Sequence, residues 1–204
     1  MMKIMIKIMR VLFVVMLLSL NTTITAGNNK FAYNGFDGGM MLHAGYINGE
    51  ITPLDYQANG ATKGIGGAIR FHFGDHFRLG TEGYTSSMDL MDNGSYIETF
   101  WAGLLADMYI VKGKFMPYAG LTVGAGAATS FLLFEGDGND WDAEPNTVFN
   151  KTGFLALNPY IGCDYIVSDT FHLTLKMDYL QGFSKKELYL PIGPRTYLGF
   201  IFFH

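Results

Sequence analysis

Charged side chains that could do chemistry recur along this chain at alternate positions of otherwise apolar segments. The candidate set consists of Arg70, Arg78, Glu82, Asp107, Asp164, His172, Lys176 and Asp178. Apart from the histidine, its three basic and four acidic groups nearly cancel, and an unpaired charge away from water is costly. The set therefore favours a network of ion pairs that fills an interior, ahead of a proton path, an ion path or a ligand site.

Histidines are the other candidates for chemistry. His43, His72 and His172 have side chains whose charge can change near neutral pH. They stand on different predicted strands without metal-ligand spacing, so we expect no metal site and no cofactor. An acyl hydrolase would need a nucleophile, a histidine and a carboxylate. Only "FHLT" (171–174) comes near, with Thr174 in place of a serine, so we expect no catalytic residues.

The segments that carry these residues have the alternation of β-strands. In "FHLTLKMDYL" (171–180) every second residue is large and apolar, and the residues between include a histidine, a lysine and an aspartate. This period of two predicts a strand with one apolar and one polar face. Eight segments show it: 39–46, 64–73, 77–86, 100–110, 118–127, 155–166, 171–180 and 196–204.

The links between the predicted strands alternate in length. Tight turns are expected at 74–76, 112–114 and 168–170. Longer polar links are expected near 47–63, 87–95, 131–152 and 182–194. This alternation puts all the tight turns at one end of the sheet. The predicted fold class is all-β, an eight-stranded antiparallel up-and-down barrel.

Residues 1–27 have the three-part layout of a secretory signal peptide. Three basic residues precede an apolar run from Val11 to Leu20, which is shorter than the ~20 residues that a spanning helix needs. We expect cleavage after Ala26 or Gly27. The remaining part, 28–204, has 11 basic and 18 acidic residues, a net charge of −7. An acidic exported chain is a poor candidate for binding nucleic acid.

Composition and glycine placement predict which face of the strands meets lipid. Charged residues make up only 16% of the chain, against about 25% in typical soluble domains. An eight-stranded barrel has an interior that side chains just fill. The charged face also carries ten glycines, which leave space for large neighbours, so we predict that Lys176 and Asp178 point inward. The turn-side aromatic residues expected at the membrane interface are Phe71, Phe73, Phe77, Tyr165 and Phe171.

With these features the chain resembles small bacterial outer-membrane β-barrel proteins of the OmpA transmembrane-domain and OmpX type, of the porin family. The resemblance covers the whole segment after the leader and includes the aromatic last strand, "YLGFIFFH" (197–204). It implies a transmembrane barrel in the outer membrane, with short periplasmic turns, long extracellular loops and both termini in the periplasm. Members typically end in an aromatic residue, whereas this chain ends in His204, which leaves the register of the last strand open.

The resemblance implies location more firmly than activity, and several functions stay open. The first is a non-catalytic barrel with a plugged lumen that serves envelope structure or makes contacts through its external loops. The alternatives are a narrow pore or carrier for small solutes and a lipid A-modifying enzyme. A soluble lipocalin-like binder is a further alternative, in which the apolar face would line a cavity.

Expected partners follow from the same resemblance. They are outer-membrane lipid, lipopolysaccharide and, during biogenesis, the barrel-assembly machinery, with a monomer as the expected state. The acidic link 134–151 does not have the spacing of a calcium-binding loop and is read as a solvated loop. The link 184–195, with adjacent Lys185 and Lys186, could meet lipopolysaccharide phosphates.

Overall fold

The structure is a computed structural model that describes residues 32–51, 56–90, 95–133, 147–184 and 191–204. The chain divides into two compact units, Met1–Phe31 and Ala32–His204, and only the second is described. The expected signal peptide at 1–27 lies outside the described residues. So do residues 134–146 and 185–190 of the two links that were considered as ligand-binding loops.

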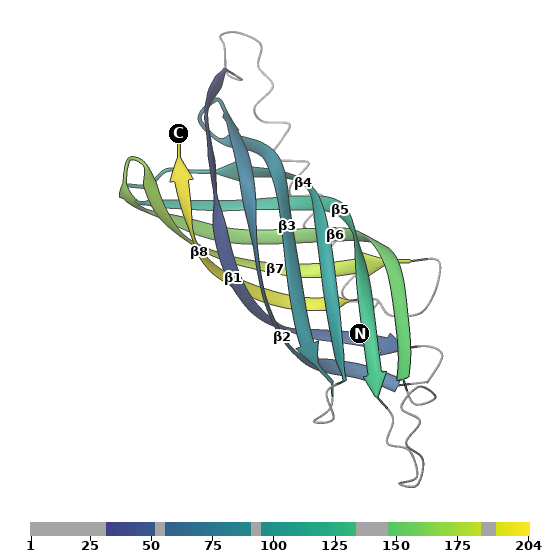
Figure 1. The fold of residues 1–204 in the computed structure, drawn as a ribbon. Helices are drawn as coiled ribbons and strands as arrows, with labels where there is room; N and C mark the ends of the chain where they lie inside the picture. Colours follow the sequence, from purple (N-terminus) through teal and green to yellow (C-terminus); the bar gives the residue numbers. More distant parts are fainter. Residues whose placement is uncertain (1–31, 52–55, 91–94, 134–146, 185–190) are drawn as a thin grey trace, which may run out of the picture. The chain divides into compact units, whose positions relative to one another are not determined.

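The second unit is a closed barrel of eight antiparallel strands in which each strand pairs with its neighbour in the sequence and β1 pairs with β8 (Figure 1). The strands are β1 (Tyr33–Ile51), β2 (Tyr56–Phe73), β3 (Phe77–Asp89), β4 (Tyr96–Tyr109), β5 (Phe115–Leu133), β6 (Thr147–Ser168), β7 (Phe171–Phe183) and β8 (Ile192–Phe203). The predicted fold class is confirmed. Among the described residues, no helix is long and apolar enough to cross a membrane.

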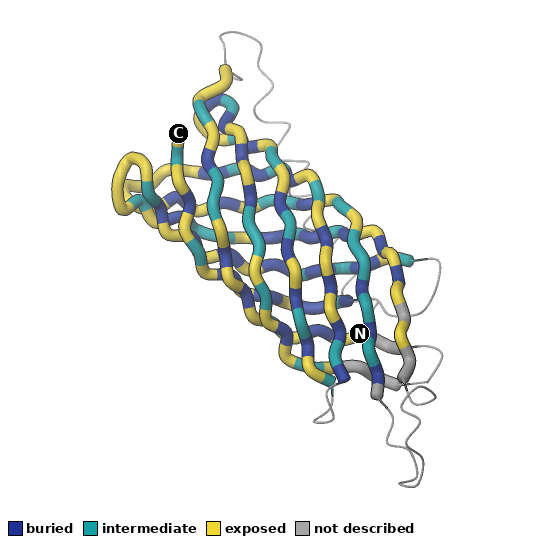
Figure 2. The backbone as a smooth tube through the Cα atoms, viewed as in Figure 1, coloured by how far each residue is buried: buried dark blue, intermediate teal, exposed yellow. Residues whose placement is uncertain are grey.

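Burial alternates residue by residue along the strands, as Figure 2 shows by the alternating colours of the tube. On β4, Leu104 is 74% exposed while its neighbour Leu105 is 3% exposed and Trp101 is 0% exposed. Among the described residues, the exposed face is rich in large apolar side chains, and the buried face carries nine charged side chains and three histidines. This orientation contradicts the lipocalin-like alternative, in which the apolar face would surround an inner cavity.

The strands are longer than their apolar portions. The expected long link at 47–63 is wrong, because β1 and β2 stay paired as far as Ile51 and Tyr56. The expected link at 131–152 was too wide for the same reason, since β5 and β6 stay paired as far as Leu133 and Thr147. Backbone hydrogen bonds between neighbouring strands form regardless of side-chain polarity, so the ladders continue past the point where the apolar alternation stops.

The last strand has a defined register despite its terminal histidine. Tyr197 and Ile201 point into the barrel, and Phe200 and Phe202 point outward. The backbone N–H of His204 donates to the carbonyl oxygen of Phe36 at 2.8 Å, so the ladder with β1 extends to the end of the chain.

Glycines on the inner face make room for aromatic rings on the next strand. Gly162 on β6 pairs with Tyr118 on β5, and a Cβ atom at Gly162 would overlap the Tyr118 ring. Gly66 on β2 has the same relation to Tyr84 on β3. Each large ring thus occupies the space that a side chain at the facing glycine would need.

Candidate functional site

A first group of charged side chains, the turn-side cluster, lies in the barrel near the short-turn end. Its members are Asp37, Arg70, Arg78, Asp107 and Asp164, and all are buried. Arg70 donates from Nε to Asp37 Oδ1 at 2.6 Å and from Nη2 to Asp164 Oδ2 at 3.0 Å. Arg78 donates from Nε to Asp107 Oδ1 at 2.6 Å and from Nη1 to Asp164 Oδ2 at 3.1 Å. Asp164 therefore bridges the two guanidinium groups.

A histidine and aromatic side chains complete this cluster. His72 Nε2 lies 2.7 Å from Asp37 Oδ2, and Tyr160 donates its hydroxyl to Asp107 Oδ2 at 3.0 Å. The guanidinium carbon of Arg78 lies 5.0 Å from the ring centre of Tyr109. Cations over aromatic faces are stabilised by the ring quadrupole, so the rings act as further partners for buried charge.

A second group, the loop-side cluster, lies farther toward the long-link end. Its members are Glu82, Asn158, Lys176, Asp178 and Arg195, and all are buried. Lys176 Nζ donates to Glu82 Oε2 at 2.5 Å. Arg195 binds Asp178 through two hydrogen bonds, from Nε at 2.9 Å and from Nη2 at 2.7 Å. Asn158 donates to the same Asp178 carboxylate at 2.8 Å.

Aromatic rings surround the one lysine of this cluster. Lys176 Nζ lies 4.3 Å from the ring centre of Tyr160, 5.1 Å from that of Tyr197 and 5.2 Å from that of Tyr84. The four basic and five acidic side chains buried in the described barrel are therefore paired with one another or packed on rings. Such an arrangement holds the buried charges in place.

Among the described residues, His43 and Ser86 come nearest to a nucleophile–base pair. His43 Nε2 lies 2.8 Å from Ser86 Oγ, and both residues are buried. His43 Nδ1 has no hydrogen-bond partner in the described part of the chain, so no carboxylate orients the ring as in a triad. The pair is also inside the packed barrel, where a substrate would have to displace neighbouring side chains. Sequence reasoning missed it because the two residues lie on different strands.

Seven of the eight predicted network residues lie in the two clusters, and His172 lies apart. His172 is buried, its ring stacks on Phe203 at 6.1 Å, and its Nδ1 atom has no described hydrogen-bond partner. Thr174, the other half of the "FHLT" pair, shares a 3.0 Å hydrogen bond with the hydroxyl of Tyr118. The two residues therefore do not form a catalytic pair.

The five predicted interface aromatics all lie on the outer wall at the turn-side ends of their strands. Phe71 and Tyr165 are exposed, and Phe73, Phe77 and Phe171 are half-buried. Phe171 contacts Phe202 of β8, with ring centres 5.4 Å apart. The outer wall at this end is thus lined by aromatic rings.

Two central members of the clusters, Asp37 and Arg195, were not predicted. Both lie on the alternation of their strands, two residues before Gly39 and two residues before Tyr197. Extending the period of two at the N-terminal ends of β1 and β8 would have found them. Arg195 was expected at the end of the link 184–195, whereas it lies within β8, directly after Pro194, which pairs with Tyr179.

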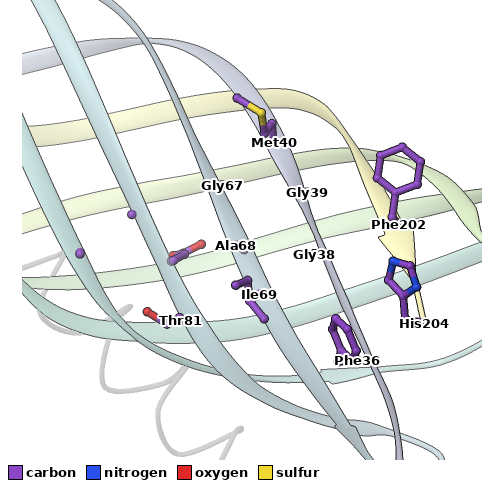
Figure 3. Close-up of a pocket in the computed structure, with 13 residues that line it drawn as sticks. Phe36, Gly38, Gly39, Met40, Gly67, Ala68, Ile69, Thr81, Phe202 and His204 are labelled. Carbon is purple, nitrogen blue, oxygen red and sulfur yellow. The ribbon is translucent and has the colours of Figure 1, made fainter.

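An open groove lies on the outer wall, and Glu82 of the loop-side cluster is among its lining residues (Figure 3). It has a volume of about 630 Å³ and runs over β1 to β4 and the end of β8. Small residues form much of its lining, among them Gly38, Gly67 and Gly83, with Met40 and Ile69 beside them. In the described part of the chain, including this groove, no three His, Cys, Asp or Glu side chains are arranged to hold a metal ion.

The same fold occurs in solved structures of bacterial surface proteins. Neisserial surface protein A matches with a TM-score of 0.58 and 14% identity, over 84% of this chain and 98% of that chain. OprG, an outer membrane protein of Pseudomonas aeruginosa, matches with a TM-score of 0.56 and 13% identity, over 87% and 99%. Ail, the attachment invasion locus protein of Yersinia pestis, in complex with the heparin analogue sucrose octasulfate, matches with a TM-score of 0.51 and 10% identity, over 84% and 100%.

These identities are low, so the likeness shows the fold alone. No protein-family model matches the chain, and no curated protein sequence matches it. The chain thus has the fold of small outer-membrane barrels, and its function must be argued from its own residues.

Proposed function

We propose that this chain is an integral protein of the bacterial outer membrane with a lumen closed by its own side chains. It is non-catalytic and serves envelope structure or makes contacts through its external loops. The observation that carries this proposal is the combination of an exposed apolar wall with an interior of paired charges. The two features together fit a barrel that is surrounded by lipid and filled with protein.

The outer wall supports a lipid environment. Its exposed residues include Leu104, Leu155 and Leu198, on three strands around the barrel. Soluble monomers rarely expose apolar surface on this scale. The outward apolar residues of β2 run from Ile65 to Phe73, which is about 26 Å along the strand and about 20 Å along the membrane normal at a tilt of ~40°. That height is comparable to the ~25 Å apolar band of membrane barrels.

The interior of the barrel supports the proposal that side chains close the lumen. The charged side chains of both clusters, from Asp37 to Arg195, are buried and joined by hydrogen bonds across the barrel. Arg70 on β2 reaches Asp164 on β6, and Lys176 on β7 reaches Glu82 on β3, so the bonds cross the lumen. A continuous water path would have to break these bonds and strand the charges.

The proposed orientation of the barrel in the membrane is based on the lengths of the links and on the signal-peptide layout of residues 1–27. We propose that residues 1–27 direct export and are removed, and that the short links at 74–76, 110–114 and 169–170 face the periplasm with both termini. A closed barrel leaves no free strand edge, which supports a monomer. The partners are then outer-membrane lipid, lipopolysaccharide and the assembly machinery.

Envelope fractionation combined with gel mobility tests the proposal. The detergent-extracted protein should remain with the outer membrane and should migrate faster when it is not boiled, because a folded barrel stays compact in detergent. Planar-bilayer recordings should show no stable conductance, and lipid A should have the same mass spectrum with and without the protein. Recovery from the soluble periplasm without a mobility shift would contradict the location. A steady conductance would contradict the plug.

A further inference from the structure

Three aromatic side chains form a row on the outer wall, beyond the apolar part of β4 to β6. This aromatic row consists of Tyr96, Phe131 and Phe149, each the cross-strand partner of the next. The rings of Tyr96 and Phe131 stack with their centres 5.4 Å apart, and Phe149 is 64% exposed. Exposed apolar side chains that gather in this way commonly mark an interaction site.

A row of polar side chains separates the aromatic row from the apolar wall. This polar row consists of Glu98, Thr129 and Lys151, which are cross-strand partners on the same three strands. Two positions farther toward the short turns, the outward residues are apolar again, with Phe100 on β4 59% exposed. The order from the middle of the wall outward is therefore apolar, polar and aromatic.

This order places the aromatic row at the level of lipid headgroups. A charged side chain on the lipid face costs most at the bilayer midplane and little near the interface, so Glu98 and Lys151 mark the edge of the hydrocarbon. Each step of two residues along a strand tilted by ~40° gains about 5 Å of height. The aromatic row thus lies about 5 Å outside that edge, whereas the aromatic girdle of a barrel adjoins the hydrocarbon itself.

We propose that the aromatic row and the polar row together bind the saccharide headgroup of a phosphorylated glycolipid of the outer leaflet, lipopolysaccharide. The inference rests on the outer-membrane location proposed above. Flat rings offer apolar faces to the C–H faces of sugar rings, Glu98 can accept hydrogen bonds from hydroxyl groups, and the Lys151 ammonium can donate to phosphate. The rows continue the lipid-facing wall on the same strands, so an occupant anchored in the bilayer covers both.

A protein partner fits this surface less well. A stable protein interface uses about 800 Å² on each side. An aromatic side chain supplies roughly 200 Å² when it is fully buried, and Tyr96 and Phe131 are already half-buried in the barrel. Three such rings supply much less contact than a protein needs, whereas the same area suffices for one or two sugar rings.

Binding of two purified glycolipids to the folded protein tests this inference. One probe is lipopolysaccharide with its core oligosaccharide, and the other is lipid A without the core. The wild-type protein should bind the first more tightly. Phe149→Ala should weaken that binding about fivefold or more, the loss expected for a residue that carries binding energy, and should leave lipid A binding unchanged. Phe149→Leu keeps an apolar side chain of similar size but has no aromatic ring. It should also lose the tighter binding of lipopolysaccharide with its core oligosaccharide.

Phe100→Ala is the matched control. Phe100 is an exposed aromatic residue of the same outer wall, and it lies on the short-turn side of the polar row. Its substitution should leave the preference for the core unchanged. Equal affinity of the wild type for both probes would overturn the inference, as would equal effects of Phe149→Ala and Phe100→Ala. An effect of Phe149→Ala on protein or cell binding with unchanged glycolipid affinity would overturn it in favour of a protein partner.

The gel-mobility test separates this inference from the proposed function. A protein that shifts on boiling and fractionates with the outer membrane, but shows no preference for the core, would overturn only the saccharide site. A protein that shows neither membrane location nor mobility shift would overturn both. Each variant is scored only after its unboiled band migrates like that of the wild type.

Discussion

Arg78 shows how a full charge is kept out of contact with water in this barrel. Its side chain is 0% exposed, yet its guanidinium donates to Asp107 and Asp164 and lies over the rings of Tyr109 and Tyr118. Burying such an ion is costly by itself, and its partners offset that cost only while all are present. The charged residues therefore depend on each other, and the loss of one partner should be more damaging than the loss of a pair.

Lys176→Met tests this dependence. The substitution removes the only cation bonded to Glu82 in the described barrel and leaves a buried carboxylate uncompensated. We expect the free energy of unfolding, measured by urea titration of the protein in lipid bilayers, to fall by about 3–5 kcal/mol. The double variant Lys176→Met with Glu82→Gln should recover much of the loss. Lys151→Met, an exposed lysine on β6, is the control and should change stability little. Equal stability of Lys176→Met and wild type would contradict the ion-pair account.

Gly162→Ala tests the packing of rings across glycine. The added methyl group would overlap the Tyr118 ring, which also packs against the guanidinium of Arg78. Overpacking of this kind costs about 1–3 kcal/mol, and it should lower the urea midpoint. Gly153→Ala is the control, because a Cβ atom there would meet only the carbonyl oxygen of Gly126 at 3.8 Å. If Gly162→Ala lowers the urea midpoint no more than Gly153→Ala does, the Tyr118 ring can move aside and the packing account is contradicted.

Individual strands owe their orientation to side-chain polarity and their length to backbone pairing. The alternation in β4 and β7 was visible in the sequence, because 100–110 and 171–180 each have apolar residues at every second position. The extensions of β1, β2, β5 and β6 were not visible, since polar residues such as Asn48 and Asn59 pair through their backbones. Side-chain patterns report burial, and they say little where both faces of a strand are polar.

The same limit explains which site residues sequence reasoning could find. Residues inside a clear alternation, such as Asp107 and Lys176, could be placed on the inner face before any coordinates. Asp37 and Arg195 lie beyond the apolar part of β1 and β8, and their partners are fixed by the register of strands distant in the sequence. The pairing of Arg70 with Asp164 likewise depends on the closure of the barrel, which brings β2 opposite β6.

Leu104→Lys tests the lipid-facing assignment of β4. Leu104 lies on the outer wall near the middle of the apolar part, where a lysine should cost about 2–4 kcal/mol of folding free energy in a bilayer. The same change at Ile110, an exposed residue at the short-turn end, should cost about 0–1 kcal/mol. Urea titrations in bilayers measure both values. Similar small costs at the two positions would mean that water, not lipid, surrounds Leu104.

At the scale of the whole molecule, the described barrel reverses the usual distribution of a soluble protein, with paired charges inside and many large apolar side chains outside. Closure of the sheet makes this possible, because β1 and β8 satisfy each other's backbone groups and leave no edge exposed to lipid. The ionic interior then takes the place of an apolar core. The function proposed for the barrel depends on this reversal, since a plugged lumen leaves its outer wall and its external loops as the surfaces available to partners.

Quenching of tryptophan fluorescence by brominated lipid chains tests the reversal most directly. Trp101 is 0% exposed inside the barrel, so in a Trp141→Phe variant folded into brominated bilayers its emission should be quenched only weakly. Adding Leu104→Trp to that variant should introduce a strongly quenched component, because the new side chain contacts lipid. Strong quenching of Trp101 together with no added quenching from Leu104→Trp would contradict the account, since it would put the charged face of the strands toward the membrane.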